Sequence, residues 1–234
     1  MPATAPITRT VGDVLDRFRA AKSDQIATIY ARRNPGVVTW GVKFGDMDKL
    51  AKQIKRDSDL ARDLWATGIL EARLLACKIV EPTDLSEAEI DRWVQDLDFP
   101  TLADFFAGVV YRTPFARDKM VAWTGSGAEF VRRAGFVLVA DFAADPSSDA
   151  SDAELRAYLD QIRTEIHGSP NWARETMNLV PIAIGKRNEA LFPLAIETAR
   201  VYGKVAVFHG DKTNCKVWDA VAALHDPKVV FKAP

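Results

Sequence analysis

Apolar residues recur at helical spacing through almost the whole chain, and this periodicity constrains the fold more than any other feature of the sequence. In the opening segment 11–33 the apolar stripe consists of Val11, Val14, Leu15, Phe18 and Ala21. Further helices are predicted within 45–56, 59–68, 69–80, 85–97, 101–112, 117–125, 128–144, 152–168, 171–185, 191–203 and 215–224. Alternating strand patterns occur only in 36–44 and 204–210. The periodicity therefore predicts an all-α protein.

The helices are separated by short turns that carry glycine or proline, and no long linker divides the chain. Several helices begin with apolar residues followed by an arginine, namely Arg73, Arg133 and Arg174. An irregular period of about 30 to 45 residues for each helix pair is typical of HEAT-type repeats. We therefore expect residues 1–234 to form a single domain, a HEAT-like/ARM-type α-solenoid of antiparallel helix pairs with a concave groove.

The charge balance excludes a protein that is basic over its whole surface, because 31 Lys and Arg face 32 Asp and Glu and the formal net charge is −1. A local basic face remains compatible with this balance. The two cysteines, Cys77 and Cys215, do not form a disulfide framework or a CxxC metal motif, and Cys77 is predicted to be a buried thiol. No segment is long and apolar enough for a signal peptide core or a membrane span, so a cytoplasmic protein without membrane contact is expected.

Two adjacent arginines, Arg132 and Arg133, stand in the apolar run "AEFVRRAGFVLVA". On a helix they point about 100° apart, so one can pair with a carboxylate such as Glu129 or Asp104 while the other faces the groove. In a stacked array, arginines and free backbone N–H groups near helix N-termini form a strip that can contact phosphates. The sequence leaves two alternatives for Arg132 and Arg133, a contact with phosphate and an ordinary ion pair between repeats.

A series of segments in order resembles the AlkD-type DNA alkylation repair proteins, which are HEAT-like repeat DNA glycosylases. They are "GVKFGDMDKLAKQIKRD", "DLARDLWATGILEARLLACKIV", "DRWVQDLDFPTLADFF", "VAWTGSGAEFVRRAGFVL" and "NWARETMNLVPIAIGKRN", spread over roughly residues 30–225. The resemblance implies a catalytic aspartate at Asp104 and a cleft arginine at Arg133. The two cleft tryptophans of the family fall on Pro100 and Leu179, so weak or altered excision is expected.

In such a reaction a carboxylate stabilises the oxocarbenium-like sugar that forms when the glycosidic bond of a cationic N3- or N7-alkylpurine breaks. Aromatic faces hold the cationic base by cation–π attraction. For Asp104 the alternative is a first-turn carboxylate that stabilises the N-terminus of its helix. The sequence therefore leaves catalysis and helix stabilisation open for this residue.

The predicted DNA contacts are basic or aromatic residues near helix starts and turns, namely Arg133, Arg132, Arg174, Trp172, Lys186 and Arg187. Core packing is the alternative for each tryptophan, although Trp172 stands at a helix start beside Arg174. Lysines 204, 212 and 216 are candidates to extend the phosphate-binding edge.

His209, Asp211 and Cys215 invite a metal interpretation, but their spacing matches no ligand pattern; a turn followed by a helix capped at Asn214 is the alternative. No P-loop, dinucleotide fingerprint or nucleophile elbow occurs, so no cofactor and no metal are predicted.

These features predict a monomeric DNA-binding protein related to alkylpurine DNA glycosylases, with alkylated double-stranded DNA as its partner. The competing hypothesis is a catalytically inactive HEAT-like scaffold that binds a nucleic acid or a protein in the same groove.

Overall fold

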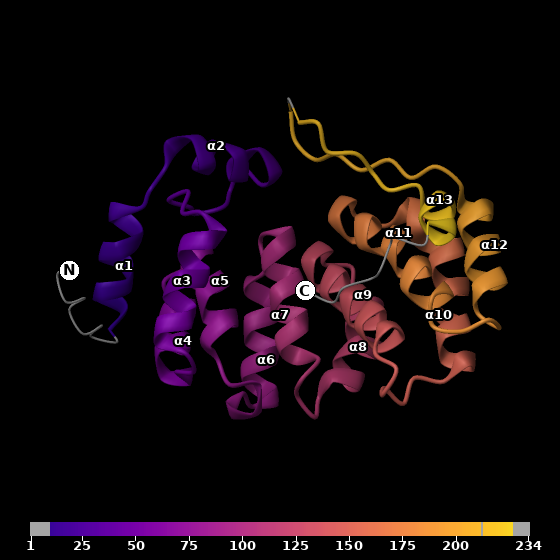
Figure 1. The fold of residues 1–234 in the computed structure, drawn as a ribbon, viewed down its shortest axis with the longest axis horizontal. Helices are drawn as coiled ribbons and strands as arrows, with labels where there is room; N and C mark the ends of the chain where they lie inside the picture. Colours follow the sequence, from indigo (N-terminus) through magenta and orange to yellow (C-terminus); the bar gives the residue numbers. More distant parts are fainter. Residues whose placement is uncertain (1–9, 212, 227–234) are drawn as a thin grey trace. The chain divides into compact units, whose positions relative to one another are not determined.

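The computed structural model describes residues 10–211 and 213–226, and every regular element within these ranges is helical. The described ranges contain thirteen α-helices and three short 3₁₀ turns. Figure 1 shows how the α-helices follow one another along the chain. The chain divides into two compact units, the first ending at Phe105 and the second beginning at Phe106, so that the boundary falls inside one helix. None of the described helices is both long and apolar enough to cross a membrane. The all-α prediction is confirmed, whereas the single domain stays a prediction.

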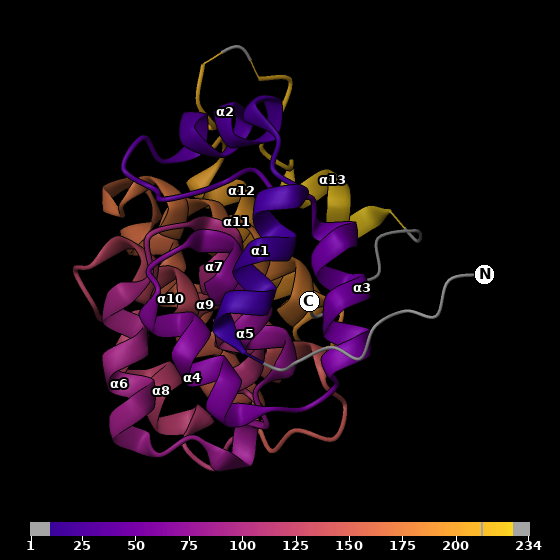
Figure 2. The same cartoon turned by 90° about the vertical axis from the view of Figure 1, so that its left-hand side faces the viewer.

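The first unit contains six complete helices and the start of a seventh. They are α1 (Val11–Ala20), α2 (Asp24–Arg33), α3 (Phe44–Ile54), α4 (Ser58–Ala66), α5 (Leu70–Ile79), α6 (Glu87–Trp93) and α7 (Pro100–Val110), with 3₁₀ turns at Pro82–Asp84 and Val94–Asp96. Helix α5 packs against both α3 and α4 (Figure 2). The periodic segment 11–33 is split into α1 and α2, because Ser23 accepts a hydrogen bond from the backbone N–H of Ile26 and caps a new helix.

The candidate strand 36–44 is a loop held by a buried carboxylate, with helix α3 starting at its last residue. Glu71 on α5 is fully buried and accepts hydrogen bonds from the backbone N–H groups of Trp40, Gly41 and Val42. Gly41 has φ of +74°, and a Cβ there would lie 2.1 Å from the Ser23 carbonyl oxygen. The alternating pattern in this segment thus arises from a loop with one buried side, not from a sheet.

The second unit is built around two central helices. Its helices are α8 (Ala116–Thr124), α9 (Glu129–Ala144), α10 (Asp152–Glu165), α11 (Asn171–Gly185), α12 (Phe192–Tyr202) and α13 (Ala220–His225), with a 3₁₀ turn at Ile166–Gly168. Helix α9 packs against α8 and α11, and most residues of α9 and α11 are buried. Gly135 permits the close approach of α8, since a Cβ there would lie 2.6 Å from the Thr124 nitrogen.

Between α12 and α13 the chain forms a long extended segment, residues 203–219, without helix or strand in its described part. Figure 1 shows this segment leaving α12, running outward and returning to α13. The prediction of a helix over 215–224 is wrong for its first half, because α13 starts only at Ala220, where the Asp219 side chain caps it. The alternative cap at Asn214 is therefore wrong as well.

Candidate nucleic-acid interface

Asp104 lies in the first unit, on α7, and its side chain is half-buried. The helix begins at Pro100 and carries no acidic residue in its first turn, so Asp104 stands one turn inside the helix. The stabilising effect of a carboxylate on a helix N-terminus falls off within the first turn. The alternative that Asp104 is a first-turn carboxylate is thus wrong, and the catalytic hypothesis stays open.

The two positions where the resemblance implies tryptophans offer no aromatic face. Pro100 is buried at the start of α7, and its neighbour Phe99 is 1% exposed. Leu179 is a half-buried aliphatic residue on α11. Neither position can stack on a cationic base.

The arginine pair on α9 is neutralised by carboxylates. Arg133 is 6% exposed, and its Nη1 donates to the carboxylate of Glu175 at 2.7 Å and to the carbonyl of Trp172 at 2.9 Å. Arg132 forms an ion pair with Glu165 at the end of α10. One partner of Arg133 is thus Glu175, a carboxylate of the next central helix.

Glu175 is the centre of a small charge cluster. Its second carboxylate oxygen lies 2.7 Å from Nε2 of His209, which is buried in segment 203–219. Burial on its own would raise the pKa of Glu175, but the charge of Arg133 and the hydrogen bonds from His209 and Arg133 outweigh it. The pKa of Glu175 is therefore held below its ordinary value.

Trp172 is a core residue, 5% exposed, whose ring meets the His209 ring edge-on with centroids 5.7 Å apart. Its backbone N–H donates to the carboxylate of Glu129 at 2.8 Å, which satisfies one of the free donors at the start of α11. Its observed contacts are those of a packing residue, and its predicted contact with DNA stays a prediction.

The other predicted basic residues have carbonyl partners instead of carboxylates. Arg174 donates to the carbonyls of Ser169 and Ala206, and Lys186 to that of Asp226. Arg187 donates to carbonyls at and beyond the C-terminal end of α9, where the helix dipole favours a cation. A carbonyl satisfies the N–H groups without neutralising the positive charge, so Arg174 and Lys186 keep their attraction for an anion. The charge of Arg187 also acts on the carboxylate of Asp145 and helps to lower the pKa of that group.

A polar face of α11 fixes the extended segment 203–219. Asn171, Arg174, Glu175 and Asn178 follow one another at intervals of three, one and three residues, which places them on one side of the helix. Asn171 exchanges two hydrogen bonds with the backbone of Phe208, at 2.7 and 2.8 Å. Asn178 donates to the carbonyl of Trp218 at 2.8 Å. The sequence did not predict the role of this polar face, because the residues that it binds lie more than 30 positions away in the chain.

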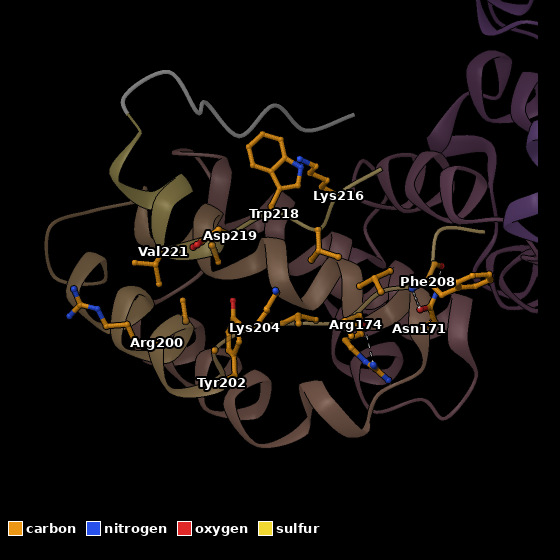
Figure 3. A pocket seen from close by; sticks show the side chains of 17 residues that line it. Asn171, Arg174, Arg200, Tyr202, Lys204, Phe208, Lys216, Trp218, Asp219 and Val221 are labelled. Atoms are coloured by element: carbon orange, nitrogen blue, oxygen red, sulfur yellow. Dashed lines mark hydrogen bonds between the residues drawn. The ribbon is translucent and has the colours of Figure 1, made fainter. Parts of the chain in front are cut away.

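A pocket of about 1100 Å³ opens between this segment and the ends of α11, α12 and α13 (Figure 3). Its lining includes four cations, Arg174, Arg200, Lys204 and Lys216, and one carboxylate, Asp219. Arg200, Lys204 and Lys216 are exposed, and none of them forms an ion pair with a described residue. Two exposed aromatic residues, Phe208 and Trp218, complete the lining. The pocket is therefore a basic and aromatic surface.

The three residues of the metal interpretation are not gathered together. His209 is bound to Glu175, while Cys215 is exposed. In the described ranges no group of three or more His, Cys, Asp or Glu side chains is arranged to hold a metal ion. Cys77, by contrast, is buried, as the sequence predicted. Lys212, a candidate for the phosphate edge, lies outside the described residues.

The helical architecture of the chain is that of the HEAT-like repeat proteins. A solved structure from a family related to the HEAT-like repeat DNA glycosylases, with affinity for branched DNA structures, matches with a TM-score of 0.82 at 26% identity over 92% of each chain. Residues 14–221 match the family described as DNA alkylation repair enzyme, and the chain belongs to this family. The sequence resemblance to this group is thus confirmed.

Two bacterial relatives are similar over most of their length. The uncharacterized protein Lin0241 of Listeria innocua is 26% identical over 189 residues, which cover 79% of this chain and 81% of its own. The uncharacterized protein Lmo0209 of Listeria monocytogenes is 24% identical over 191 residues, with the same coverage. The similarity extends over both units of this chain.

Proposed function

We propose that this protein binds DNA and that it binds branched DNA more tightly than a continuous duplex of equal length. The observation that carries the proposal is the likeness, at a TM-score of 0.82, to a structure from a family with affinity for branched DNA. Membership of the DNA alkylation repair enzyme family supports it.

We assign the phosphate contacts to cations of the second unit that form no ion pair with a described residue. They are Arg174, Lys186, Arg187, Lys204 and Lys216. Because the formal net charge is −1, attraction to DNA has to come from such a local group and not from the whole molecule. Arg132 and Arg133 are neutralised, so a stabilising role is favoured for them, with a phosphate contact as the competing prediction.

The test compares the affinity of the protein for a four-way junction, a forked duplex and a linear duplex of the same total length, measured by fluorescence anisotropy over a range of salt concentrations. We expect tighter binding to the branched molecules and a linear fall of log K with log salt, because each neutralised phosphate releases counterions. Equal affinity for all three molecules contradicts the preference for branches. No binding at low salt contradicts DNA binding altogether and favours the scaffold that binds a protein.

A second function, excision of cationic alkylpurines, rests on Asp104. It is the half-buried carboxylate on α7 at the position where the resemblance implies the catalytic aspartate, and the helix N-terminus does not account for it. A cationic N3- or N7-alkylpurine is already activated as a leaving group, so one carboxylate that stabilises the sugar cation suffices for a measurable rate. With Pro100 and Leu179 in place of aromatic faces, about 0.5 to 2 kcal/mol of cation–π stabilisation is missing at each site, and excision is slow.

Excision is tested by base release from duplexes that contain 7-methylguanine or 3-methyladenine, at equal DNA occupancy of the wild type and Asp104→Asn. The substitution removes the negative charge and keeps the shape of the side chain, and we expect a loss of about 100-fold or more in rate. Unchanged release in Asp104→Asn contradicts the assignment. Absence of release from a wild type that still binds the duplex leaves a binding protein without excision activity.

A further inference from the structure

Two aromatic side chains in segment 203–219 are exposed although their backbones are fixed. Phe208 is 62% exposed and Trp218 is 57% exposed. The backbone N–H and carbonyl of Phe208 are both bound by Asn171, and the carbonyl of Trp218 is bound by Asn178. Both side chains line the same pocket. Because hydrogen bonds from α11 fix the backbone at both positions, less conformational freedom is lost when a ligand binds there, which lowers the entropic cost of binding.

The charge around these rings is positive. In the pocket lining, Arg200, Lys204 and Lys216 have no ion-pair partner among the described residues. The one lining carboxylate, Asp219, accepts the hydrogen bond that caps α13. Figure 3 shows Trp218 and Lys216 at one rim of the pocket and Tyr202 and Lys204 on the opposite side in this view. A ligand with both a flat ring and an anionic group fits this arrangement.

Building on the proposed DNA binding, we propose that this pocket holds an unpaired nucleotide of a DNA strand. The base stacks on the indole of Trp218, and its phosphates lie against Lys204 and Lys216. Phe208 provides a second stacking face for a neighbouring base.

The chemistry of the pocket selects unpaired nucleotides over paired ones. Within a duplex the faces of the bases are covered by their neighbours, so an exposed indole finds no free ring to stack on. Unpaired bases at the arms of a branched molecule present free faces, and basic grooves with aromatic side chains are how single strands are bound without regard to sequence. The pocket thus gives a physical reason for a preference for branches that carry unpaired arms.

The experiment measures the affinity of the full chain for a fork with unpaired thymidine arms and for a four-way junction without unpaired bases. Trp218→Ala is expected to weaken binding to the fork about ten-fold, within the range of base–aromatic stacking, and to leave binding to the junction unchanged. Trp218→Phe retains a stacking face and is expected to restore most of the affinity. Val201→Ala is the control, since Val201 is 55% exposed on α12 but does not line the pocket.

Tryptophan fluorescence gives an independent readout. Among the tryptophans Trp218 is exposed, Trp40 is half-buried and the other four are buried. Stacking of a base on Trp218 is therefore expected to quench the emission when a thymidine oligonucleotide is added, and the quenching is expected to disappear in Trp218→Phe, which still binds. Competition by free thymidine 5′-phosphate at the same concentration overturns the strand proposal in favour of a free nucleotide.

The outcomes separate the two proposals. If the wild type binds no DNA of any kind, DNA binding itself fails. If it binds both molecules and Trp218→Ala binds the fork as tightly as the wild type does, the unpaired-nucleotide site is wrong while DNA binding stands.

Discussion

The interface of α9 with α11 and the extended segment 203–219 both carry cations close to aromatic rings, but they treat charge in opposite ways. In the interface Arg133 is buried and paired with Glu175, whereas Lys204 and Lys216 in the segment are exposed and form no ion pair with any described residue. A buried guanidinium needs a carboxylate because desolvation of a lone charge is costly. An exposed ammonium remains hydrated and keeps its charge available for a ligand.

A position near a helix start in the sequence therefore does not decide which cation binds an anion. Both regions are also connected, because Glu175 binds Arg133 with one oxygen and His209 of the segment with the other. The ion pair of Arg133 with Glu175 therefore also helps to fix segment 203–219, through the contact of Glu175 with His209.

The largest effect is expected for Arg133→Met. It leaves the Glu175 carboxylate without its main partner in a mostly buried site, and the free energy of unfolding is expected to fall by about 3 kcal/mol. Urea denaturation measures this loss. The double variant Arg133→Met, Glu175→Met is expected to be more stable than Arg133→Met, since it removes the isolated charge.

The same variant decides between the two roles of Arg133. If Arg133 only stabilises the core, the slope of log K for DNA against log salt is the same in the folded variant and the wild type. A slope that falls by about one shows that Arg133 contacts a phosphate directly, and it contradicts the purely stabilising role of the α9–α11 interface.

The next largest effect is expected for the removal of both exposed lysines, Lys204→Ala and Lys216→Ala. Each lost phosphate contact lowers the salt slope by about 0.9 on a duplex and weakens binding about five-fold near physiological salt. The free energy of unfolding is expected to change little, because neither ammonium makes an ion pair within the part of the chain that the structure describes. Unchanged affinity in a salt titration would remove these lysines from the interface.

Lowering the pH is expected to weaken the interactions of Glu175 with Arg133 and His209 and to leave the charge of the exposed lysines unchanged. The pKa of Glu175 is lowered in the folded state from its ordinary 4.5, so its ionised form contributes stability above pH 4.5. That contribution is lost as the pH falls from 4.5 through the lowered pKa. The effect is smaller than that of Arg133→Met, since a protonated Glu175 still accepts a hydrogen bond. Unfolding curves between pH 6 and pH 3 are expected to show a weaker pH dependence in Glu175→Gln; equal slopes refute the assignment.

The smallest effect is expected for Arg163→Ala on α10. Arg163 pairs with Asp160 at the surface, where both side chains are largely exposed. Such a pair contributes less than about 0.5 kcal/mol, and the residue has no place in the proposed interface. Neither stability nor the salt slope is expected to change, which makes this variant the matched control for the lysine substitutions.

The sequence predicted helices well where local periodicity and capping agree. The helix predicted over 171–185 is α11 residue for residue, and the one over 128–144 differs from α9 by a single residue. The prediction of a helix was wrong over 215–219. The apolar residues there have helical spacing, but contacts with α11 hold the backbone in an extended conformation. Hydrogen bonds between residues about 40 positions apart leave no periodic signal in the chain.

For the candidate site the sequence correctly predicted a carboxylate partner for the arginine pair. It did not identify Glu175 on α11, which lies 42 positions beyond Arg133 in the chain. Which carboxylate meets a guanidinium depends on how two helices pack, and packing is a property of the whole unit.

The helical class, the family and the approximate helix bounds could all be predicted from the sequence, because they depend on residue spacing along one chain. Which cations are neutralised and which remain available depends on how the chain packs, since burial and pairing arise when distant segments meet. The face of α11 that holds segment 203–219 shows the reason: its four polar residues are unremarkable in sequence, and they acquire a role only through the backbone that packs on them.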